Sequence, residues 1–290
     1  MRSGARNAAV DFARRFSFNV YRSSITARSQ LARARKAPAG RTVPVRLSMT
    51  TYPARVGAAC QTLETIIYGQ RVRPEAVTLV LAEDEFAGTS NLPLRLRRLE
   101  DHGLEVLWVP RSTRSYMKLL PALERYPAET IVTADDDILY PAWWLELLVE
   151  AHTRHPGTIV GHRGWEVRIR GARNLVPYTH WARATTRTAS ARTFLTGVGG
   201  VLYPPGCLPM EAHETALIER LSPNADDVWF HAMALLRGTP VRVTLDPPVD
   251  FPSTWRTGNP AGLQATNVRG GQNDLALNAV YDHWELWDVV

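Results

Sequence analysis

Cysteine is scarce in this chain of 290 residues, which contains only Cys60 and Cys207. Both are far apart in the sequence and set among apolar residues, which fits a reducing compartment and excludes a disulfide scaffold. We expect both thiols to be buried packing residues, because an isolated apolar cysteine usually behaves as a small hydrophobic side chain.

Long apolar runs are also missing, and no stretch reaches the ~18 residues that a membrane-spanning helix needs. The N-terminus lacks the apolar core of a secretory signal, since arginines recur at Arg14, Arg22 and Arg33. We therefore expect a cytoplasmic protein, peripheral at most on the inner face of the cell membrane.

Several catalytic motifs are absent as well. The eight histidines show no zinc-ligand spacing, and neither Ser nor Cys stands in a nucleophile elbow. The glycines at 197–200 precede an apolar strand, whereas a phosphate-binding loop follows a strand and opens a helix. These absences exclude zinc hydrolysis, serine-type acyl transfer and a P-loop nucleotide site.

Acidic residues are nearly absent from residues 1–46, which hold ten Arg and one Lys against the single acid Asp11. The remaining 244 residues hold 23 basic and 27 acidic side chains. The net charge of +6 therefore belongs to an N-terminal tail, and the folded body is mildly acidic. This distribution argues against nucleic acid as a partner.

The tail, residues 1–42, ends in a linker and includes apolar residues spaced among the arginines of residues 8–36. A basic amphipathic helix of this kind can bind an anionic membrane surface, here through residues 1–36. A solvated tail that only aids solubility explains the same pattern, and the sequence leaves both open.

From residue 43 onward, apolar strands alternate with helices of 3.6-residue periodicity. We expect strands at 43–49, 77–82, 104–109 and 130–133, separated by helices at 56–67, 92–101 and 116–125. Helices at 143–155, 225–237 and 274–287, and strands near 201–203 and 241–245, are expected to follow. This order predicts an α/β fold with a doubly wound, mainly parallel sheet and a smaller mixed region, and ligands of such sheets bind at the carboxyl ends of the strands.

Three adjacent acids, Asp135, Asp136 and Asp137, follow the strand expected at 130–133. In extended backbone Asp135 and Asp137 point to one side and Asp136 to the other. Two carboxylates on one side repel each other unless a cation intervenes, and Mg²⁺ or Mn²⁺ is commonly held by one or two carboxylates together with substrate phosphates. The alternative is an acidic turn that caps the following helix.

A second acidic pair, Asp226-Asp227, begins the helix expected at 225–237. Acids at a helix N-terminus are favoured by the macrodipole, so both can be purely structural. Only one is needed for a cap, however, and the other can serve as a general base. The many tryptophans can pack against sugar rings, although most are expected in the core.

Together these blocks resemble the DxD-containing, nucleotide-sugar-dependent glycosyltransferases of the GT-A fold, of the bacterial polysaccharide or lipopolysaccharide type. The resemblance rests on residues 48–55, 133–140, 195–206 and 225–230, and extends over roughly 43–281. It implies one GT-A-like domain at 43–290, with a nucleotide-binding half at 43–140 and an acceptor half at 141–290.

The resemblance also assigns roles. It places Thr51, Arg55, Glu83, Lys118, Asp135 and Asp136 at the nucleotide sugar, and Asp135 and Asp137 at Mn²⁺ or Mg²⁺. Asp227 is implied as the base of an inverting reaction, with Asp226 beside it in place of the family's usual Glu. Gly199, Gly200 and Trp229 are expected to contact the acceptor.

The implied substrates are a nucleoside-diphosphate sugar, a UDP-sugar first, and a glycan or lipid-linked acceptor. A sugar nucleotidyltransferase is the nearest alternative, but it would usually have a Gly-rich loop where Thr50–Arg55 stands. A non-catalytic, membrane-peripheral carbohydrate-binding protein would explain the tryptophans and the tail, but not the acidic clusters.

Overall fold

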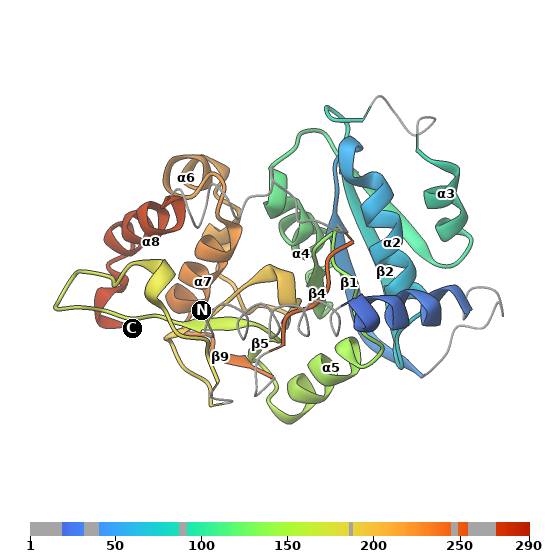
Figure 1. Ribbon diagram of the computed structural model, residues 1–290. Coiled ribbons are helices and arrows are strands. Elements are labelled where there is room, and N and C mark those ends of the chain that lie inside the picture. Colours follow the sequence, from blue (N-terminus) through green and yellow to red (C-terminus); the bar gives the residue numbers. More distant parts are fainter. Residues whose placement is uncertain (1–18, 32–40, 87–91, 186–187, 245–248, 255–270) are drawn as a thin grey trace, which may run out of the picture.

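A seven-stranded sheet forms the centre of the computed structural model, which describes residues 19–31, 41–86, 92–185, 188–244, 249–254 and 271–290 (Figure 1). Its strand order is β3-β2-β1-β4-β8-β5-β9. The strands are β1 (Thr42–Thr50), β2 (Arg73–Ala82), β3 (Leu104–Val109), β4 (Ile131–Ala134), β5 (Ile159–Gly161), β8 (Val201–Tyr203) and β9 (Val241–Val243). Only β8 pairs antiparallel with its neighbours, so the predicted mainly parallel, doubly wound α/β fold is confirmed.

A smaller antiparallel sheet pairs β6 (Gly164–Glu166) with β7 (Thr193–Leu195). It forms part of the predicted mixed region. The main sheet runs without interruption from the first half of the domain into the second, because β8, β5 and β9 continue beyond β4.

Helices cover both faces of the main sheet. One face packs against α2 (Val56–Ile67), α3 (Leu94–Glu100) and α5 (Trp144–Arg154). The other packs against α4 (Leu120–Arg125), α6 (Thr215–Leu221), α7 (Asp226–Arg237) and α8 (Gln272–His283). Alternate residues of β1 explain why a helix layer covers this face, since Val45, Leu47 and Met49 all point into the same apolar core. Each such buried side chain contributes roughly 1.5–3 kcal/mol to the stability of the fold.

The helix expected at 116–125 is interrupted in the structure. A 3-10 segment, Arg114–Lys118, is followed by α4, and the junction residue Leu119 has a φ of −123°. Pro121 lies in the first turn of α4, where a missing N–H costs nothing. The interruption matters for the site because it turns the buried Lys118 toward the carboxyl ends of the strands.

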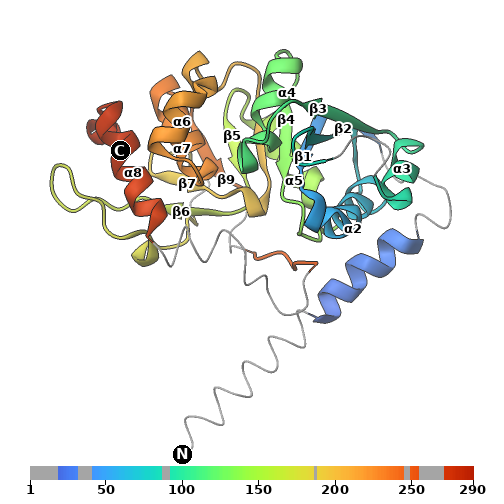
Figure 2. The same ribbon diagram turned by 90° about the horizontal axis from the view of Figure 1, so that it is seen from above.

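Residues 19–31 form a helix that contacts the body of the protein (Figure 2). The Arg28 side chain donates to the carbonyl of Gly69 at 3.3 Å, and Arg22 donates to the carbonyl of Thr254. Ile25 is buried. This part of the basic tail is therefore not a free solvated segment, although Val20 and Leu31 of the same helix are exposed. The rest of the tail before residue 41 lies outside the described residues.

Both cysteines are buried free thiols, as predicted, and burial raises the pKa of Cys60 to about 11. Within the described ranges, no helix is long and apolar enough to cross a bilayer.

Candidate active site

The site lies where the direction of the strand order reverses. β1 and β4 are parallel neighbours, yet the chain continues from β1 to β2 on one side and from β4 towards β8 on the other. Such a switch point leaves a crevice at the carboxyl ends of the two strands. Thr51 follows β1 and Asp135, Asp136 and Asp137 follow β4, so the fold brings them to one place.

Asp136 is the innermost of the three acids. Its carboxylate accepts a hydrogen bond from the Thr51 hydroxyl at 2.7 Å and forms an ion pair with Arg55 at 3.1 Å. Burial raises the pKa of Asp136 to about 6, against the opposing effect of Arg55. Asp136 is therefore a structural anchor between the ends of β1 and β4.

Asp137 also pairs with Arg55, so one guanidinium holds two neighbouring carboxylates. Burial raises the pKa of Asp137, and Arg55 opposes that effect. The strict alternation predicted for extended backbone is wrong here, because β4 ends at Ala134 and a turn begins at Asp136. The exposed fractions of the three side chains nevertheless differ, with Asp135 and Asp137 at 28% and 20% against 7% for Asp136.

Main-chain contacts fix the shape of this acidic turn. The N–H of Asp135 donates to the Tyr140 hydroxyl at 3.0 Å, and the Thr62 hydroxyl donates to the carbonyl of Asp136 at 3.0 Å. The N–H of Thr254 donates to the carbonyl of Asp137 at 2.7 Å. Tyr140 is close to the turn in sequence, whereas Thr62 and Thr254 come from distant segments. The carboxylates are thus held in place before any ligand binds.

Lys118 joins this turn to the second acidic pair. Its Nζ lies 2.8 Å from Asp135 Oδ1 and 3.0 Å from Asp226 Oδ2. Burial alone would lower the pKa of Lys118. The charges of Asp135, Asp226 and Asp227 outweigh this effect and raise the pKa to well above its usual range. Lys118 therefore stays protonated and is the counter-charge of both clusters.

Asp227 lies in the first turn of α7, and its Oδ1 accepts the N–H of Gly197 at 2.9 Å. The pKa of Asp227 is raised to about 7 by burial and by the charge of Asp226, while Lys118 lowers it. The helix cap is Ala225, and neither acid makes a side-chain capping bond. Capping therefore does not explain the pair.

Gly197, which was not among the predicted site residues, lies at the contact between the two acidic clusters. A Cβ on Gly197 would lie 2.4 Å from Lys118 Nζ and 3.3 Å from both Asp135 Oδ1 and Asp227 Oδ1. The absence of a side chain there is what lets the two acidic clusters meet. The glycine run at 197–200 was compatible equally with a tight turn and with a close approach of the backbone, and the sequence could not indicate which glycine faced the acids.

One of the expected acceptor contacts, that of Trp229, is corrected by the structure. Trp229 is fully buried, and its indole N–H donates to the carbonyl of Ala212, so its ring is a core element. A Cβ on Gly199 would meet Arg163, and one on Gly200 (φ +82°) would meet the Trp144 ring at 2.4 Å. The lack of a side chain at these two glycines thus accommodates internal packing, and their contact with an acceptor stays a prediction.

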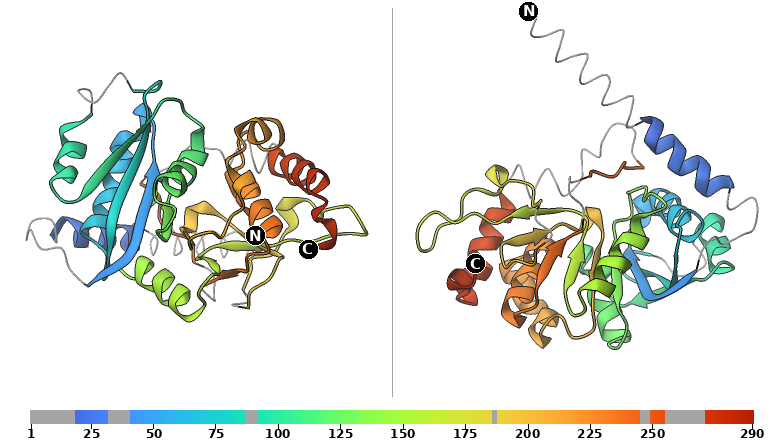
Figure 3. Two further views of the ribbon diagram at one scale, coloured as in Figure 1. Left: turned by 180° about the vertical axis from the view of Figure 1, so that it is seen from behind. Right: turned by 90° about the horizontal axis from the view of Figure 1, so that it is seen from below.

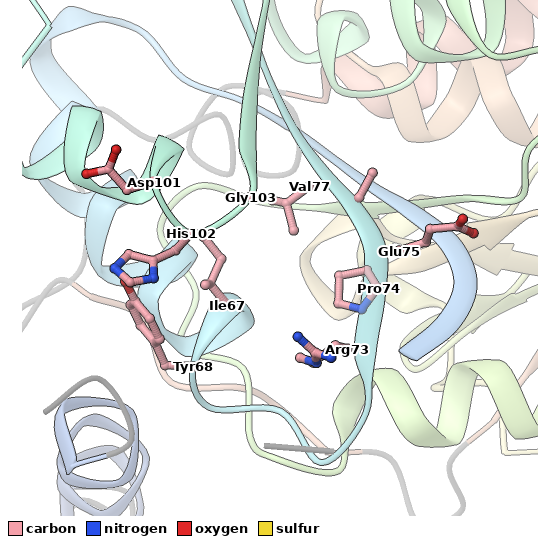
Figure 4. Close-up of a pocket in the computed structure, with 10 residues that line it drawn as sticks. Ile67, Tyr68, Arg73, Pro74, Glu75, Val77, Asp101, His102 and Gly103 are labelled. Atoms are coloured by element: carbon pink, nitrogen blue, oxygen red, sulfur yellow. The ribbon is translucent and has the colours of Figure 1, made fainter. Parts of the chain in front are cut away.

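Glu83 is exposed directly after β2, next to β1 in the sheet, and its N–H donates to the carbonyl of Val109. None of its described contacts reaches the acidic turn. A cavity of about 350 Å³ lies at the other end of the strands, lined by residues such as Arg73, Asp101 and His102 (Figure 4). It is formed at the start of β2, away from the acids.

A divalent ion fits the chemistry of the two outer carboxylates. Among the described residues, no three His, Cys, Asp or Glu side chains gather as a complete ligand set. Asp135 and Asp137 are partly exposed oxygen donors, which suits an ion that takes its other ligands from phosphate and water. Lys118 and Arg55 now neutralise these carboxylates.

Comparison with known proteins gives no family model and no curated protein that matches the chain. Among solved structures, it is similar to S. aureus TarS 1-349, with 15% identity and a TM-score of 0.47 over 72% of this chain and 59% of that one. It thus spans less than two thirds of the TarS fragment.

Two further structures are similar. The mannosyltransferase PcManGT from Pyrobaculum calidifontis, in complex with GDP-Man and Mn2+, has 17% identity and a TM-score of 0.47 over 93% of this chain and 84% of that one. The 4-diphosphocytidyl-2C-methyl-D-erythritol synthase from Anaerococcus prevotii has 11% identity and a TM-score of 0.41 over 76% and 94%. Likenesses at this level transfer neither substrate nor metal to this chain.

Proposed function

We propose that the protein is a metal-dependent glycosyltransferase that moves a sugar from a nucleoside-diphosphate sugar to a glycan or lipid-linked acceptor. One observation supports this above all. A turn of three acids after β4 meets a second acidic pair across Lys118 and Gly197, at the switch point of a parallel sheet. One cluster can bind a metal diphosphate, and the other contains an acid with a pKa near neutrality.

The donor would bind over the acidic turn. Arg55 and Lys118 place two positive charges beside the carboxylates that would face the diphosphate, and Thr51 stands at the end of β1. Glu83, at the end of the adjacent strand, is our candidate for the base or ribose. UDP is the nucleotide we expect first.

Mn²⁺ or Mg²⁺ would be held by Asp135 and Asp137, and when bound it would stabilise the negative charge that grows on the leaving diphosphate. Arg55 also pairs with Asp136, so it could keep the turn anchored if Asp137 were engaged by the ion. Lys118 likewise keeps its contact with Asp226 when Asp135 is engaged.

Asp227 is our candidate for the general base. Its Oδ1 is oriented by the N–H of Gly197, and its raised pKa makes it able to accept a proton near neutral pH. It would remove the proton of the acceptor hydroxyl as that oxygen attacks the anomeric carbon, which gives inversion. Asp226, paired with Lys118, raises the basicity of Asp227 by its charge.

A nucleotidyltransferase is less well supported. Residues after β1 form a short 3-10 turn, Pro53–Arg55, with Pro at its start, instead of a glycine-rich loop that could wrap a triphosphate. A non-catalytic binding protein would gain nothing from an acid of raised pKa held by a backbone N–H. Both remain alternatives that the assay below distinguishes.

Membrane contact through residues 1–36 is a further part of the proposal. The two arginines of the described helix, Arg22 and Arg28, donate to the body, so the remaining basic residues of the tail would make that contact. Such a location would bring the enzyme to lipid-linked acceptors.

The test is turnover of a panel of nucleotide sugars with Mn²⁺, followed as nucleoside diphosphate release. We expect release from at least one donor, its loss in excess EDTA, and its loss in Asp137→Ala. Asp101→Asn, an exposed acid beside the distant cavity, is the matched control and should retain full activity. Undiminished release in EDTA and in Asp137→Ala would refute the metal site. Release of pyrophosphate from a nucleoside triphosphate would favour the nucleotidyltransferase.

A further inference from the structure

The segment from Arg163 to Leu195 has a charge opposite to that of its surroundings. It contains seven arginines and one acid, Glu166, although the chain after residue 46 is acidic overall. In the fold it includes the small sheet and extends beside α8, where the N–H of Tyr178 donates to Asp274 (Figure 3). A surface of this charge next to an acidic catalytic site requires an explanation.

Two of these arginines are held close to Gly197. Arg163 Nη1 donates to the Thr196 hydroxyl at 2.9 Å, and its Nε lies 3.2 Å from Asp250. Arg183 Nη2 lies 2.6 Å from the same Asp250 oxygen. Both guanidiniums also lie over the ring of Trp165, at 5.3 and 4.5 Å from its centroid. The pair is therefore fixed in orientation on both sides by an aromatic ring and a carboxylate.

The hydrogen-bonding capacity of this group is not used up. One carboxylate serves two guanidiniums, which leaves a surplus positive charge. Arg183 Nη1 and Trp165 Nε1 are covered from solvent and have no hydrogen-bond partner among the described residues. Covered donors without a partner are unfavourable, and more so when they are charged, so a ligand oxygen that accepts from them would be favoured.

Arg163, one member of the arginine pair, lies within one acceptor unit of Asp227. Thr196 bonds Arg163 and the adjacent Gly197 bonds Asp227, so the guanidinium and the carboxylate are roughly 10 Å apart along these contacts. Burial and the charge of Asp227 raise the pKa of Tyr178, and the charges of Arg163 and Arg183 lower it, so all three groups are within electrostatic range of its hydroxyl. A hydroxyl at Asp227 and a charged group on the same or the next sugar can reach both.

Resting on the proposed function, we propose that Arg163, Arg183, Trp165 and Thr196 form an acceptor subsite for a glycan bearing an oxyanion, either a phosphate or a carboxylate. The guanidinium fork of Arg183 would donate two parallel hydrogen bonds to the oxyanion, and the Trp165 ring would contact the sugar. Asp250 would hold both arginines in position, and the surplus positive charge of the pair would set the preference for an anionic acceptor.

The test compares glucose, glucose 6-phosphate and glucuronate as probes of the full chain, titrated by tryptophan fluorescence. We expect one or both anionic sugars to bind at least tenfold more tightly than glucose, with affinity that falls as salt is raised. The phosphate and carboxylate probes distinguish the two sources. Equal binding of all three sugars would overturn the proposal, and this comparison needs no variant.

Arg183→Gln should abolish the anionic preference, whereas Arg173→Gln, an exposed arginine of the same segment, should retain it. Asp250 keeps Arg163 as a partner in Arg183→Gln, and thermal melting verifies the fold. A preference unchanged in folded Arg183→Gln would contradict the subsite. A parallel nucleotide-sugar titration separates the two claims: donor binding without anionic preference refutes only the subsite, and anionic preference without donor binding refutes only the proposed function.

Discussion

At the scale of the residue, two cationic side chains, Lys118 and Arg55, are the counter-charges of all the acids of the site. Asp135, Asp226 and Asp227 share Lys118, and Asp136 and Asp137 share Arg55. Burial raises the pKa of several of these carboxylates, so each is held against its preference for water. A structure that retains such a cluster gains from it in binding or catalysis rather than in stability.

Asp227→Asn tests the base. We expect turnover to fall about 10²–10⁴-fold while donor affinity is retained, because the amide cannot accept the proton. In the unaltered enzyme, kcat/KM should fall below a pH of about 7, as Asp227 becomes protonated. A profile that stays level down to pH 5 would contradict the assignment.

Asp227→Asn, which should lower turnover, should by contrast raise the stability of the fold. Because the folded-state pKa of Asp227 is raised, the folded protein binds this proton more tightly than the unfolded chain does, so stability is lost as pH rises from about 4 to about 7. Asp227→Asn removes that loss and should raise the melting temperature at pH 8 by about 2 °C, and less at pH 4. Equal shifts at both pH values would show that charge is not the cause.

Lys118→Met tests the shared counter-charge. Removing one partner of a buried ionic cluster leaves Asp135 and Asp226 uncompensated, and we expect a loss of about 3–5 kcal/mol in urea unfolding at pH 7. The control is Arg71→Met, which breaks a more exposed pair with Glu146 and should cost no more than about 1 kcal/mol. Similar losses in both variants would mean that Lys118 is not the centre of the cluster.

At the scale of the element, the loops after the strands do the positioning. β4 brings the acidic turn, the 3-10 segment Arg114–Lys118 brings the lysine, and η5 (Gly197–Gly199) brings the backbone N–H. α7 then brings Asp226 and Asp227 in its first turn. Each element ends or begins at the point where it supplies its polar group.

Gly197→Ala tests this convergence. Its Cβ would displace Lys118 Nζ, the far end of a side chain held by two carboxylates, so we expect a loss of donor turnover of tenfold or more with the fold retained. Gly57→Ala is the control, because nothing lies within 4 Å of its Cβ in α2, and it should stabilise by about 0.5–1 kcal/mol. Full activity of Gly197→Ala would show that the clusters need not meet there.

The strands and most helices could be predicted from periodicity, because buried parallel strands read as apolar runs and covering helices as amphipathic stripes. The acids were identified by their positions after a strand and at the start of a helix. The direction of each side chain could not be predicted, since the turn at Asp136 ends the strand alternation and the break at Leu119 depends on tertiary packing. Trp229 shows the same limit, because the residue type alone does not distinguish a buried tryptophan from one that binds a sugar.

At the scale of the whole molecule, charge is divided between regions with different surroundings. The basic tail lies partly on the body through the helix at 19–31, the catalytic centre is acidic, and the segment 163–195 is basic again. The +6 of the chain is therefore a sum over three unlike regions.

The tail predicts binding to anionic vesicles. Sedimentation with phosphatidylserine-containing vesicles at low salt should carry down the full chain, and a variant with the arginines at 2, 6, 14 and 15 changed to Gln should bind several-fold less. Neutral phosphatidylcholine vesicles are the control. Equal binding to both vesicle types would remove the electrostatic basis of the membrane proposal.

The most direct test of the glycosyltransferase proposal is thermal stabilisation by nucleotide sugars with and without Mn²⁺. A donor present at about 100 times its Kd should stabilise the folded protein by about 2.7 kcal/mol, which corresponds to a rise of roughly 5–10 °C in Tm. We predict such a shift for at least one nucleotide sugar, dependent on Mn²⁺ and absent in Asp137→Ala. No shift with any nucleotide sugar, in the presence of Mn²⁺ or Mg²⁺, would contradict the account.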